Sequence, residues 1–268
     1  MRNTAGIDVG STYTKAVVTD QDGTMLGRAV EPTGFRLTDV ANSTLETALA
    51  RAGCARKDLA YVVATGFGRH QVRVGDVRVT DLTAGARGAT LLFPGTKTIL
   101  DVGGQTMKAT HVGAGAKVQS FRLNDKCAAG TGAFLEKTAR YMGYATEEIG
   151  PLVQTSKVAT SISGVCAVFA ESEVINHLSQ GVAPADIMHG AIVSLVGRSV
   201  QLMKRVGMEP EFTLIGGILR FERMVHVIRE QIGAPVNVPA GDLVQFTSAL
   251  GAALLGHIRL RQLAAAAA

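Results

Sequence analysis

Two segments of the sequence place an aspartate and a glycine-rich turn directly after a short apolar strand. Residues 8–12 read Asp-Val-Gly-Ser-Thr, and residues 101–105 read Asp-Val-Gly-Gly-Gln. A glycine lets the backbone approach a phosphate closely, and the N–H groups of such a turn form an anion-binding nest. Phosphate binding is the chemistry that both segments predict, and the candidate contact residues are Gly10, Ser11, Thr12, Lys15, Gly103 and Gly104.

The side chains around these turns suit a magnesium nucleotide. Asp8 and Asp101 can hold Mg²⁺ directly or through water, and Gln105 can orient an attacking water. A third apolar strand ends in Gly216-Gly217, which adds another close backbone approach. Two ordinary β-turns are the structural alternative, although the pairing of the motif argues against it. No P-loop and no G-x-G-x-x-G after a strand is present.

Cys127 and Cys166 each lie at the end of a loop of small residues, just before a segment with helical periodicity. The positive end of a helix lowers the pKa of a thiol and favours the thiolate that binds metals. A [4Fe–4S] cluster needs four ligands, so two per chain suffice only on a two-fold or pseudo-two-fold axis, which predicts a dimer. Two buried structural cysteines are the alternative. Cys54, next to basic residues, fits a packed or surface thiol better than a reactive one.

The elements that must position these residues can be read from the periodicity. Strands are expected at 5–9, 16–19, 25–29, 61–66, 98–102, 107–112 and 212–215, and Asp22-Gly23 predicts a hairpin between the second and the third. The two strand–Asp–x–Gly turns, which we call corners, repeat one design about ninety residues apart. Helices are expected at 38–52, 131–142, 166–180, 184–206 and 220–231. Gly130, Thr131 and Gly132 open the first helix of the second half, where they line a nucleotide cleft or simply cap the helix.

Composition excludes several classes of protein. The 268 residues are 47% apolar and 18% charged, which excludes a disordered chain, and no apolar run is long enough for a membrane span. The net charge of +5 comes from scattered basic residues, and only 5% of residues are aromatic, so nucleic-acid binding is not expected. The start does not read as a signal peptide, and we expect a cytoplasmic protein.

The segments 8–12, 101–105 and 215–217 resemble the two phosphate loops and the adenosine loop of the actin, Hsp70 and sugar-kinase superfamily. That resemblance implies an α/β fold of two ribonuclease-H-like lobes with ATP and Mg²⁺ in the cleft between them. We expect lobe I at 1–123 with both phosphate loops and lobe II at 124–245 with the cysteines and the adenosine loop. Residues 246–268 are expected to form a helix that returns to lobe I.

The stretches N-D-K-C-A-A-G-T-G-x-F-L-E (124–136) and C-x-V-F-A-E-S-E-V-I (166–175) are more specific. They resemble the ATP-dependent activators of 2-hydroxyacyl-CoA dehydratases and the ATPase subunits of benzoyl-CoA reductase, over nearly the whole chain. The resemblance implies a [4Fe–4S] cluster that Cys127 and Cys166 share across a subunit interface. It also implies a ferredoxin-type electron donor and ATP hydrolysis that drives a low-potential electron into a partner component.

Two departures place the chain within this family. Homodimeric activators usually read D-I-G-G-Q-D, whereas Thr106 follows Gln105 here, and Ala133 stands where arginine is common. The form D-V-G-G-Q-T-M-K resembles the smaller ATPase subunit of benzoyl-CoA reductase. We therefore expect a heterodimer with a paralogous ATPase subunit, attached to a catalytic component that reduces an acyl-CoA.

Three other functions compete with this interpretation. The nearest alternative is a homodimeric activator that docks on a 2-hydroxyacyl-CoA dehydratase. A small-molecule kinase of the same superfamily would use a catalytic aspartate to deprotonate a hydroxyl, but would not need paired cysteines before helices. A nucleotide-gated binding protein without turnover is the third. The identity of the acyl-CoA does not follow from this chain.

Overall fold

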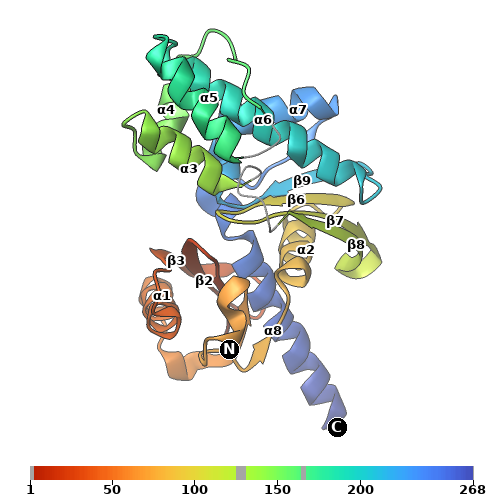
Figure 1. Ribbon diagram of the computed structural model, residues 1–268. Helices are drawn as coiled ribbons and strands as arrows, with labels where there is room; N and C mark the ends of the chain where they lie inside the picture. Colours follow the sequence, from red (N-terminus) through yellow and green to blue (C-terminus); the bar gives the residue numbers. More distant parts are fainter. Residues whose placement is uncertain (1–2, 125–130, 164–166, 268) are drawn as a thin grey trace. The chain divides into compact units, whose positions relative to one another are not determined.

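The computed structural model describes residues 3–124, 131–163 and 167–267 (Figure 1). The chain divides into two compact units: unit 1 comprises Met1–Thr96, Val112–Gln119 and Pro239–Ala268, and unit 2 comprises Lys97–His111 and Ser120–Val238. Residues 97–111, which carry the second Asp–Gly corner, thus group with unit 2, whereas the sequence analysis assigned them to the first lobe. The reason is strand pairing, because the strand at 98–102 pairs with the strand at 212–215.

Unit 1 is built on a five-stranded sheet in the order β3-β2-β1-β4-β5. The strands are β1 (Asn3–Val9), β2 (Tyr13–Thr19), β3 (Met25–Pro32), β4 (Leu59–Thr65) and β5 (Val77–Arg78). β1 pairs antiparallel with β2 and parallel with β4. The expected hairpin at Asp22-Gly23 joins β2 to β3, with Gly23 at φ +83°. The meander of the first three strands therefore forms as the turn residues predict.

Helices cover both faces of this sheet. Helix α1 (Leu37–Ala52) packs on one face through a core that includes Ile7, Val9, Leu45 and Leu49. Helices α2 (Asp81–Leu92) and α8 (Thr247–Ala266) cover the other face, as the contact of Val63, Ala84 and Ala252 shows. Both faces of β1 are therefore buried, which explains why its sequence is apolar without alternation.

Glycines allow α8 to approach its neighbours very closely. A Cβ at Gly6 would collide with the Ala249 carbonyl on α8. Gly251 faces the Ala84 carbonyl of α2 in the same way, and Gly88 of α2 faces the carbonyl of Thr247. The crossing of α2 and α8 is thus a contact between two backbones, which only glycine permits.

The second five-stranded sheet has the order β10-β9-β6-β7-β8. Its strands are β6 (Thr98–Val102), β7 (Met107–Gly113), β8 (Lys117–Asn124), β9 (Phe212–Ile215) and β10 (Val236–Asn237). β6 pairs antiparallel with β7 and parallel with β9. Written from the other edge, the order β8-β7-β6-β9-β10 repeats that of the first sheet, so the duplication expected from the two Asp–Gly corners is confirmed.

Unit 2 carries most of the remaining helices. They are α3 (Gly132–Tyr141), α4 (Ile149–Gln154), α5 (Ala167–Ser179), α6 (Pro184–Lys204) and α7 (Glu222–Ile232). Figure 1 shows α6 and α7 above β6 and β9, and the Ser199 hydroxyl of α6 lies 3.0 Å from the Met107 sulfur of β7. The core between helices and sheet includes the fully buried Leu100, Leu135, Ile192 and Leu195.

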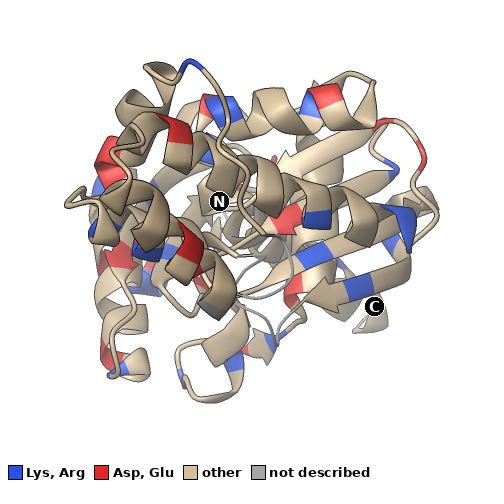
Figure 2. Cartoon of the chain, turned by 45° about the horizontal axis from the view of Figure 1, so that its top comes forward, with Lys and Arg blue, Asp and Glu red and all other residues tan. Residues whose placement is uncertain are grey.

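Charged side chains of both signs are interspersed along the ribbon. Figure 2 shows Lys and Arg segments next to Asp and Glu segments on the same elements, in keeping with the scattered basic residues of the sequence. Within residues 3–124, 131–163 and 167–267, no helix combines the length and the apolar character that a bilayer span requires.

Candidate functional site

The first corner is the turn that connects β1 to β2. Cross-strand register places Asp8 opposite Lys15, and the Lys15 Nζ lies 3.4 Å from the Asp8 Oδ2. Both side chains are largely buried, with 14% of Lys15 and 13% of Asp8 exposed. A carboxylate and an ammonium group are thus held together beside the Gly10-Ser11-Thr12 turn, whose residues are partly exposed.

Thr33 fixes the shape of this turn from the end of β3. Its hydroxyl donates to the Gly10 carbonyl at 2.8 Å, and its N–H donates to the Thr12 carbonyl at 2.9 Å. A Cβ on Gly10 would lie 3.2 Å from the Lys15 Nζ and still closer to the Tyr13 carbonyl. The absence of a side chain at Gly10 therefore keeps the lysine and the turn within reach of one ligand.

The second corner repeats this arrangement in unit 2. Asp101 on β6 lies opposite Lys108 on β7, and the Lys108 Nζ is 3.4 Å from the Asp101 Oδ2. The exposed fractions are again small, at 12% for Lys108 and 17% for Asp101. Gly103 closes the turn by donating its N–H to the Thr106 carbonyl at 2.8 Å.

A glycine with positive φ completes each corner. Gly66, at φ +88°, follows the β4 residue that pairs with Asp8, and Gly216, at φ +103°, follows the β9 residue that pairs with Asp101. A Cβ on either glycine would meet the Oδ1 of the neighbouring aspartate and a main-chain carbonyl. Both glycines are therefore required by conformation and by space.

The N-terminus of α3 is attached to the second corner by its backbone. The Gly132 N–H donates to the Gly103 carbonyl at 3.0 Å, and the Ala133 N–H donates to the Gly104 carbonyl at 2.7 Å. Thr131 is fully buried at the N-cap position, where its side chain makes no capping hydrogen bond. The backbone contact explains why small residues begin this helix: a Cβ on Gly132 would also press on Ile218.

Two members of these corners are not among the residues predicted from the sequence. Lys108 is the counterpart of Lys15, and Gly66 is the counterpart of Gly216. A signal for Lys108 exists in the sequence, since a lysine stands seven residues after each aspartate. Gly66 ends a predicted strand, but its position beside Asp8 depends on the parallel pairing of β1 with β4.

The remaining predicted residues are distributed as follows. Gln105 is exposed, Gly216 and Gly217 lie directly after β9, and Gly217 begins the short helix Gly217–Arg220. Cys127, Cys166 and Gly130 lie outside the described residues. Helix α3 begins five positions after Cys127, and α5 begins at the position after Cys166. Within the described part of the chain, no group of three or more His, Cys, Asp or Glu side chains could hold a metal ion.

Cys54 lies in a packed environment. Its Sγ accepts a hydrogen bond from the Asn3 Nδ2 at 3.3 Å and donates to the Ala52 carbonyl at 3.4 Å. The side chain is partly buried against the core beneath α1. A packed thiol, the simpler of the two expectations, describes it.

Carboxylates on α3 and α5 are tied to other groups in unit 2. Glu171 accepts from the Lys137 Nζ at 2.6 Å and from the Tyr141 hydroxyl at 3.2 Å, and the hydrogen bond with Glu171 raises the pKa of Lys137. Burial raises the pKa of Glu136, and the positive charge of Arg220 opposes that effect. The carboxyl group of Glu136 on α3 and the guanidinium group of Arg220, in the segment after Gly216, thus attract each other.

The two corners have the donor set that a magnesium nucleotide requires. Each provides a carboxylate for the cation, an ammonium group for phosphate oxygens, and a turn without side-chain bulk. When bound, Mg²⁺ would compete with the lysine for the aspartate, and phosphate would compete with the aspartate for the lysine. The ion pairs therefore satisfy each corner internally, and the same carboxylates and ammonium groups would be available to a magnesium nucleotide.

Comparison with known proteins agrees with these observations. Over 251 residues the chain is 37% identical to a 2-hydroxyisocaproyl-CoA dehydratase activator of Clostridioides difficile, covering 94% of this chain and 93% of that protein. It is 34% identical to the (R)-2-hydroxyglutaryl-CoA dehydratase activating ATPase of Acidaminococcus fermentans, over 95% and 96% of the two chains. It is 32% identical to a benzoyl-CoA reductase subunit of Thauera aromatica, over 98% and 96%.

Solved structures show the same relationship. Component A of the (R)-2-hydroxyglutaryl-CoA dehydratase from Acidaminococcus fermentans superposes with a TM-score of 0.92 at 32% identity, covering 97% of this chain and 99% of that one. The activator of the Clostridium difficile 2-hydroxyisocaproyl-CoA dehydratase with bound ADPNP gives 0.91 at 35%, covering 97% and 96%. A glucokinase of the ROK family from Streptomyces griseus gives a TM-score of 0.60 at 18% identity, covering 96% of this chain and 99% of that one. This similarity shows a shared fold alone.

The expected α/β architecture of the actin and sugar-kinase type is thereby confirmed. The model of one family matches residues 5–256, a range that includes both corners, Cys127 and Cys166. The chain belongs to the BadF/BadG/BcrA/BcrD ATPase family.

Proposed function

We propose that this protein is an ATP-hydrolysing activator of a 2-hydroxyacyl-CoA dehydratase. The relatives named as dehydratase activators are 37% and 34% identical to it, whereas the benzoyl-CoA reductase subunit is 32% identical. The comparisons thus favour the dehydratase activator, the alternative left open by the sequence, over the reductase subunit that the sequence motifs predict. Thr106 is a single residue, and it carries less weight than identity over the whole chain.

The observation that supports ATP hydrolysis most directly is the duplicated corner. Asp8 with Lys15 and Asp101 with Lys108 give two buried ion pairs at the same distance, each beside a glycine turn. We infer that both corners contact the phosphates and the magnesium ion of ATP. A structural relative was determined with ADPNP, which is consistent with nucleotide binding by this fold.

Hydrolysis needs a water aimed at the γ-phosphorus. Gln105 is exposed directly after the second glycine turn, and its amide can hold a water there. The attack forms a P–O bond to the water oxygen and breaks the bond to the bridging oxygen, which leaves with ADP. Lys15 and Lys108 stabilise the charge that develops on the phosphate oxygens.

The attachment of α3 suggests how hydrolysis acts at a distance. Gly103 and Gly104 accept backbone hydrogen bonds from the first residues of α3, and this helix follows the segment that contains Cys127. A change of the second corner on loss of the γ-phosphate would therefore move the start of α3. We propose that Cys127 and Cys166 of two copies hold a [4Fe–4S] cluster, which supplies the low-potential electron that passes to the dehydratase.

Cluster binding and dimer formation are tested in one experiment. The chain is purified without oxygen, and iron, acid-labile sulfide and molecular mass are measured for the wild type and for Cys127→Ser, Cys166→Ser and Cys54→Ser. We expect a homodimer with about four irons that both bridging variants lose and the Cys54→Ser control retains. Iron that remains in both bridging variants would refute the ligand assignment.

The activity test adds ATP, a low-potential reductant and a 2-hydroxyacyl-CoA dehydratase component. We expect dehydration that depends on ATP hydrolysis by this chain. If the chain hydrolyses ATP but no dehydratase responds, the activator proposal fails while the ATPase assignment stands.

A subunit of an ATP-dependent benzoyl-CoA reductase is the second candidate. The D-V-G-G-Q-T-M-K form of the second corner and the 32% identity over 278 residues favour it. This candidate predicts that the chain co-purifies from its source with a paralogous ATPase subunit and a catalytic component. Isolation as a homodimer that activates a dehydratase would exclude it.

A further inference from the structure

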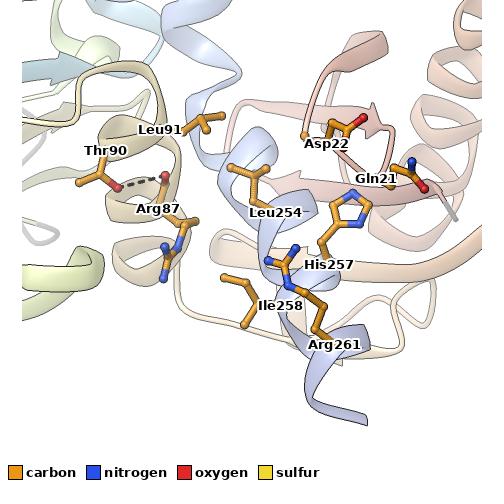
Figure 3. A pocket seen from close by; sticks show the side chains of 10 residues that line it. Gln21, Asp22, Arg87, Thr90, Leu91, Leu254, His257, Ile258 and Arg261 are labelled. Carbon is orange, nitrogen blue, oxygen red and sulfur yellow. Dashed lines mark hydrogen bonds between the residues drawn. The ribbon is translucent and has the colours of Figure 1, made fainter. Parts of the chain in front are cut away.

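Unit 1 contains a pocket that neither corner uses. It has a volume of about 310 Å³, at the small end of the range for ligand sites. Figure 3 shows three elements around it: helix α2, helix α8 and the hairpin between β2 and β3. The lining residues are Gln21, Asp22, Gly23, Arg87, Thr90, Leu91, Leu254, His257, Ile258 and Arg261.

The hairpin lies close to α8 because Gly23 carries no side chain. A Cβ at this position, where φ is +83°, would lie 2.9 Å from the Leu254 Cδ2. The pocket wall is therefore built by the fold, through a residue whose conformation and space both favour glycine.

Two guanidinium groups line the pocket without a carboxylate partner. Within the described residues, neither Arg87 nor Arg261 makes an ion pair, and Arg87 Nη2 donates only to the carbonyl of Gly115, at 3.0 Å. The Arg87 Nε is buried and has no hydrogen-bond partner. Arg87 is partly buried, whereas Arg261 is exposed near the end of α8. A partly buried charge such as that of Arg87 is costly without a counter-ion, so this site favours an anion.

His257 contributes a neutral wall. Its Nε2 lies 3.0 Å from the Thr19 hydroxyl, and the residue is only 7% exposed. Burial lowers the pKa of His257, and the positive charge of Arg261 lowers it further, against the opposite effect of Asp20 and Asp22. The ring is thus uncharged at neutral pH, and Asp22 is the single acidic side chain that lines the pocket.

The rest of the lining is apolar. Leu91 from α2 and Leu254 and Ile258 from α8 present aliphatic carbon to the space near the two arginines. An inorganic anion would leave these side chains without a partner, whereas a chain of methylene groups would cover them. The ligand that matches both features has a charged head and a short apolar tail.

We propose that this pocket binds a small organic monocarboxylate, with its carboxylate at Arg87 and Arg261 and its aliphatic chain on Leu91, Leu254 and Ile258. One negative charge offsets the excess of two arginines over Asp22. The site lies wholly within unit 1 and involves no residue of either corner.

Isothermal titration calorimetry of the purified protein with sodium hexanoate tests the proposal, with hexan-1-ol and inorganic phosphate as comparison probes. We expect saturable binding of hexanoate that is at least about tenfold tighter than that of either comparison, because a charge-assisted hydrogen bond contributes about 1.5–3 kcal/mol. No saturable binding of hexanoate, or equal binding of phosphate, would overturn the proposal.

Substitutions of the lining residues test whether hexanoate binds in this pocket. Arg261→Gln should weaken hexanoate binding about tenfold, whereas Arg259→Gln, an exposed arginine on the same helix that does not line the pocket, should leave it unchanged. Leu91→Trp should block the apolar part, and its partly exposed position on α2 should tolerate the change. Equal binding by Arg261→Gln and Arg259→Gln would place the ligand elsewhere and refute the site.

Discussion

The two Asp–Lys corners are alike in the groups that meet a ligand and different in what holds them. Each ion pair spans 3.4 Å and each is joined by a glycine of positive φ from the neighbouring parallel strand. The first turn is tied to Thr33, at the end of β3. The second is tied to the first residues of α3.

This difference separates two tasks. A turn tied to a residue at the end of β3 is held by its own sheet, so the proposed function makes the first corner a fixed phosphate contact. A turn tied to the start of a helix moves with that helix, so the second corner can report the state of the nucleotide to α3. The duplicated element thus repeats the same set of side chains, and its two copies differ in the element to which each is attached.

The largest effect is expected from removing the charge of either aspartate. Asp8→Asn and Asp101→Asn should each lower kcat for ATP hydrolysis by about a thousandfold, because each loses a magnesium ligand and the partner of a buried lysine. The rate of ATP hydrolysis is measured from the release of inorganic phosphate. Asp242→Asn, an exposed carboxylate that pairs with Arg28, is the matched control and should keep full activity.

The proposed cluster provides a second readout for these variants. Iron content and visible absorbance should equal those of the wild type, since neither aspartate lies in the cysteine segments. Near wild-type hydrolysis by either variant would show that its corner does not hold the nucleotide.

The next largest effect is expected from filling the space beside each aspartate. Gly66→Ala and Gly216→Ala should each lower the free energy of unfolding by about 2–4 kcal/mol and hydrolysis by about a hundredfold, because φ is positive and the Cβ meets main-chain carbonyls. Urea denaturation and hydrogen exchange measure the loss.

Hydrogen exchange distinguishes the two corners in these variants. Faster exchange at the start of α3 should follow Gly216→Ala and not Gly66→Ala. Gly53→Ala provides a control for positive φ alone, because no atom lies within 4 Å of its Cβ position. If Gly53→Ala costs as much stability as the other two, crowding is not the cause.

A smaller effect is expected from the lysines. Lys15→Gln and Lys108→Gln should each weaken ATP binding about tenfold, since each removes one charged contact to phosphate. Fluorescent-nucleotide titration measures the affinity, with the exposed Lys57→Gln and Lys204→Gln as controls in the two units. An effect of Lys15 without an effect of Lys108 would break the equivalence of the corners.

The smallest effect is expected from a change at Thr33, which tests how the attachment of the first turn differs from that of the second. Thr33→Val removes the hydroxyl that donates to the Gly10 carbonyl and contacts the Thr14 hydroxyl at 3.0 Å. We expect a loss of about 1 kcal/mol in stability and a two- to threefold rise in KM for ATP. The coupling of hydrolysis to dehydratase activation should be unchanged, and a selective loss of coupling would contradict the role given to the first corner.

Much of the local structure was predictable from the sequence. The helix expected at 38–52 forms at Leu37–Ala52, that at 184–206 forms at Pro184–Lys204, and the strand at 212–215 is β9. Local signals suffice here because apolar periodicity and turn residues act within a few positions of the chain. Helix α2 was not predicted, because its glycines and small residues resemble a loop until α8 packs against them.

The two strand–Asp–Gly corners, their repetition and the ATPase family can be recognised from the amino-acid sequence alone, since each depends on residues close together in the chain. The tertiary structure alone places Gly66 beside Asp8 and binds the start of α3 to the second corner. These contacts join segments far apart in the sequence, through strand register and the parallel pairing of β1 with β4 and β6 with β9. Register and pairing are set by the packing of the whole sheet, so no local pattern of residues could have specified them.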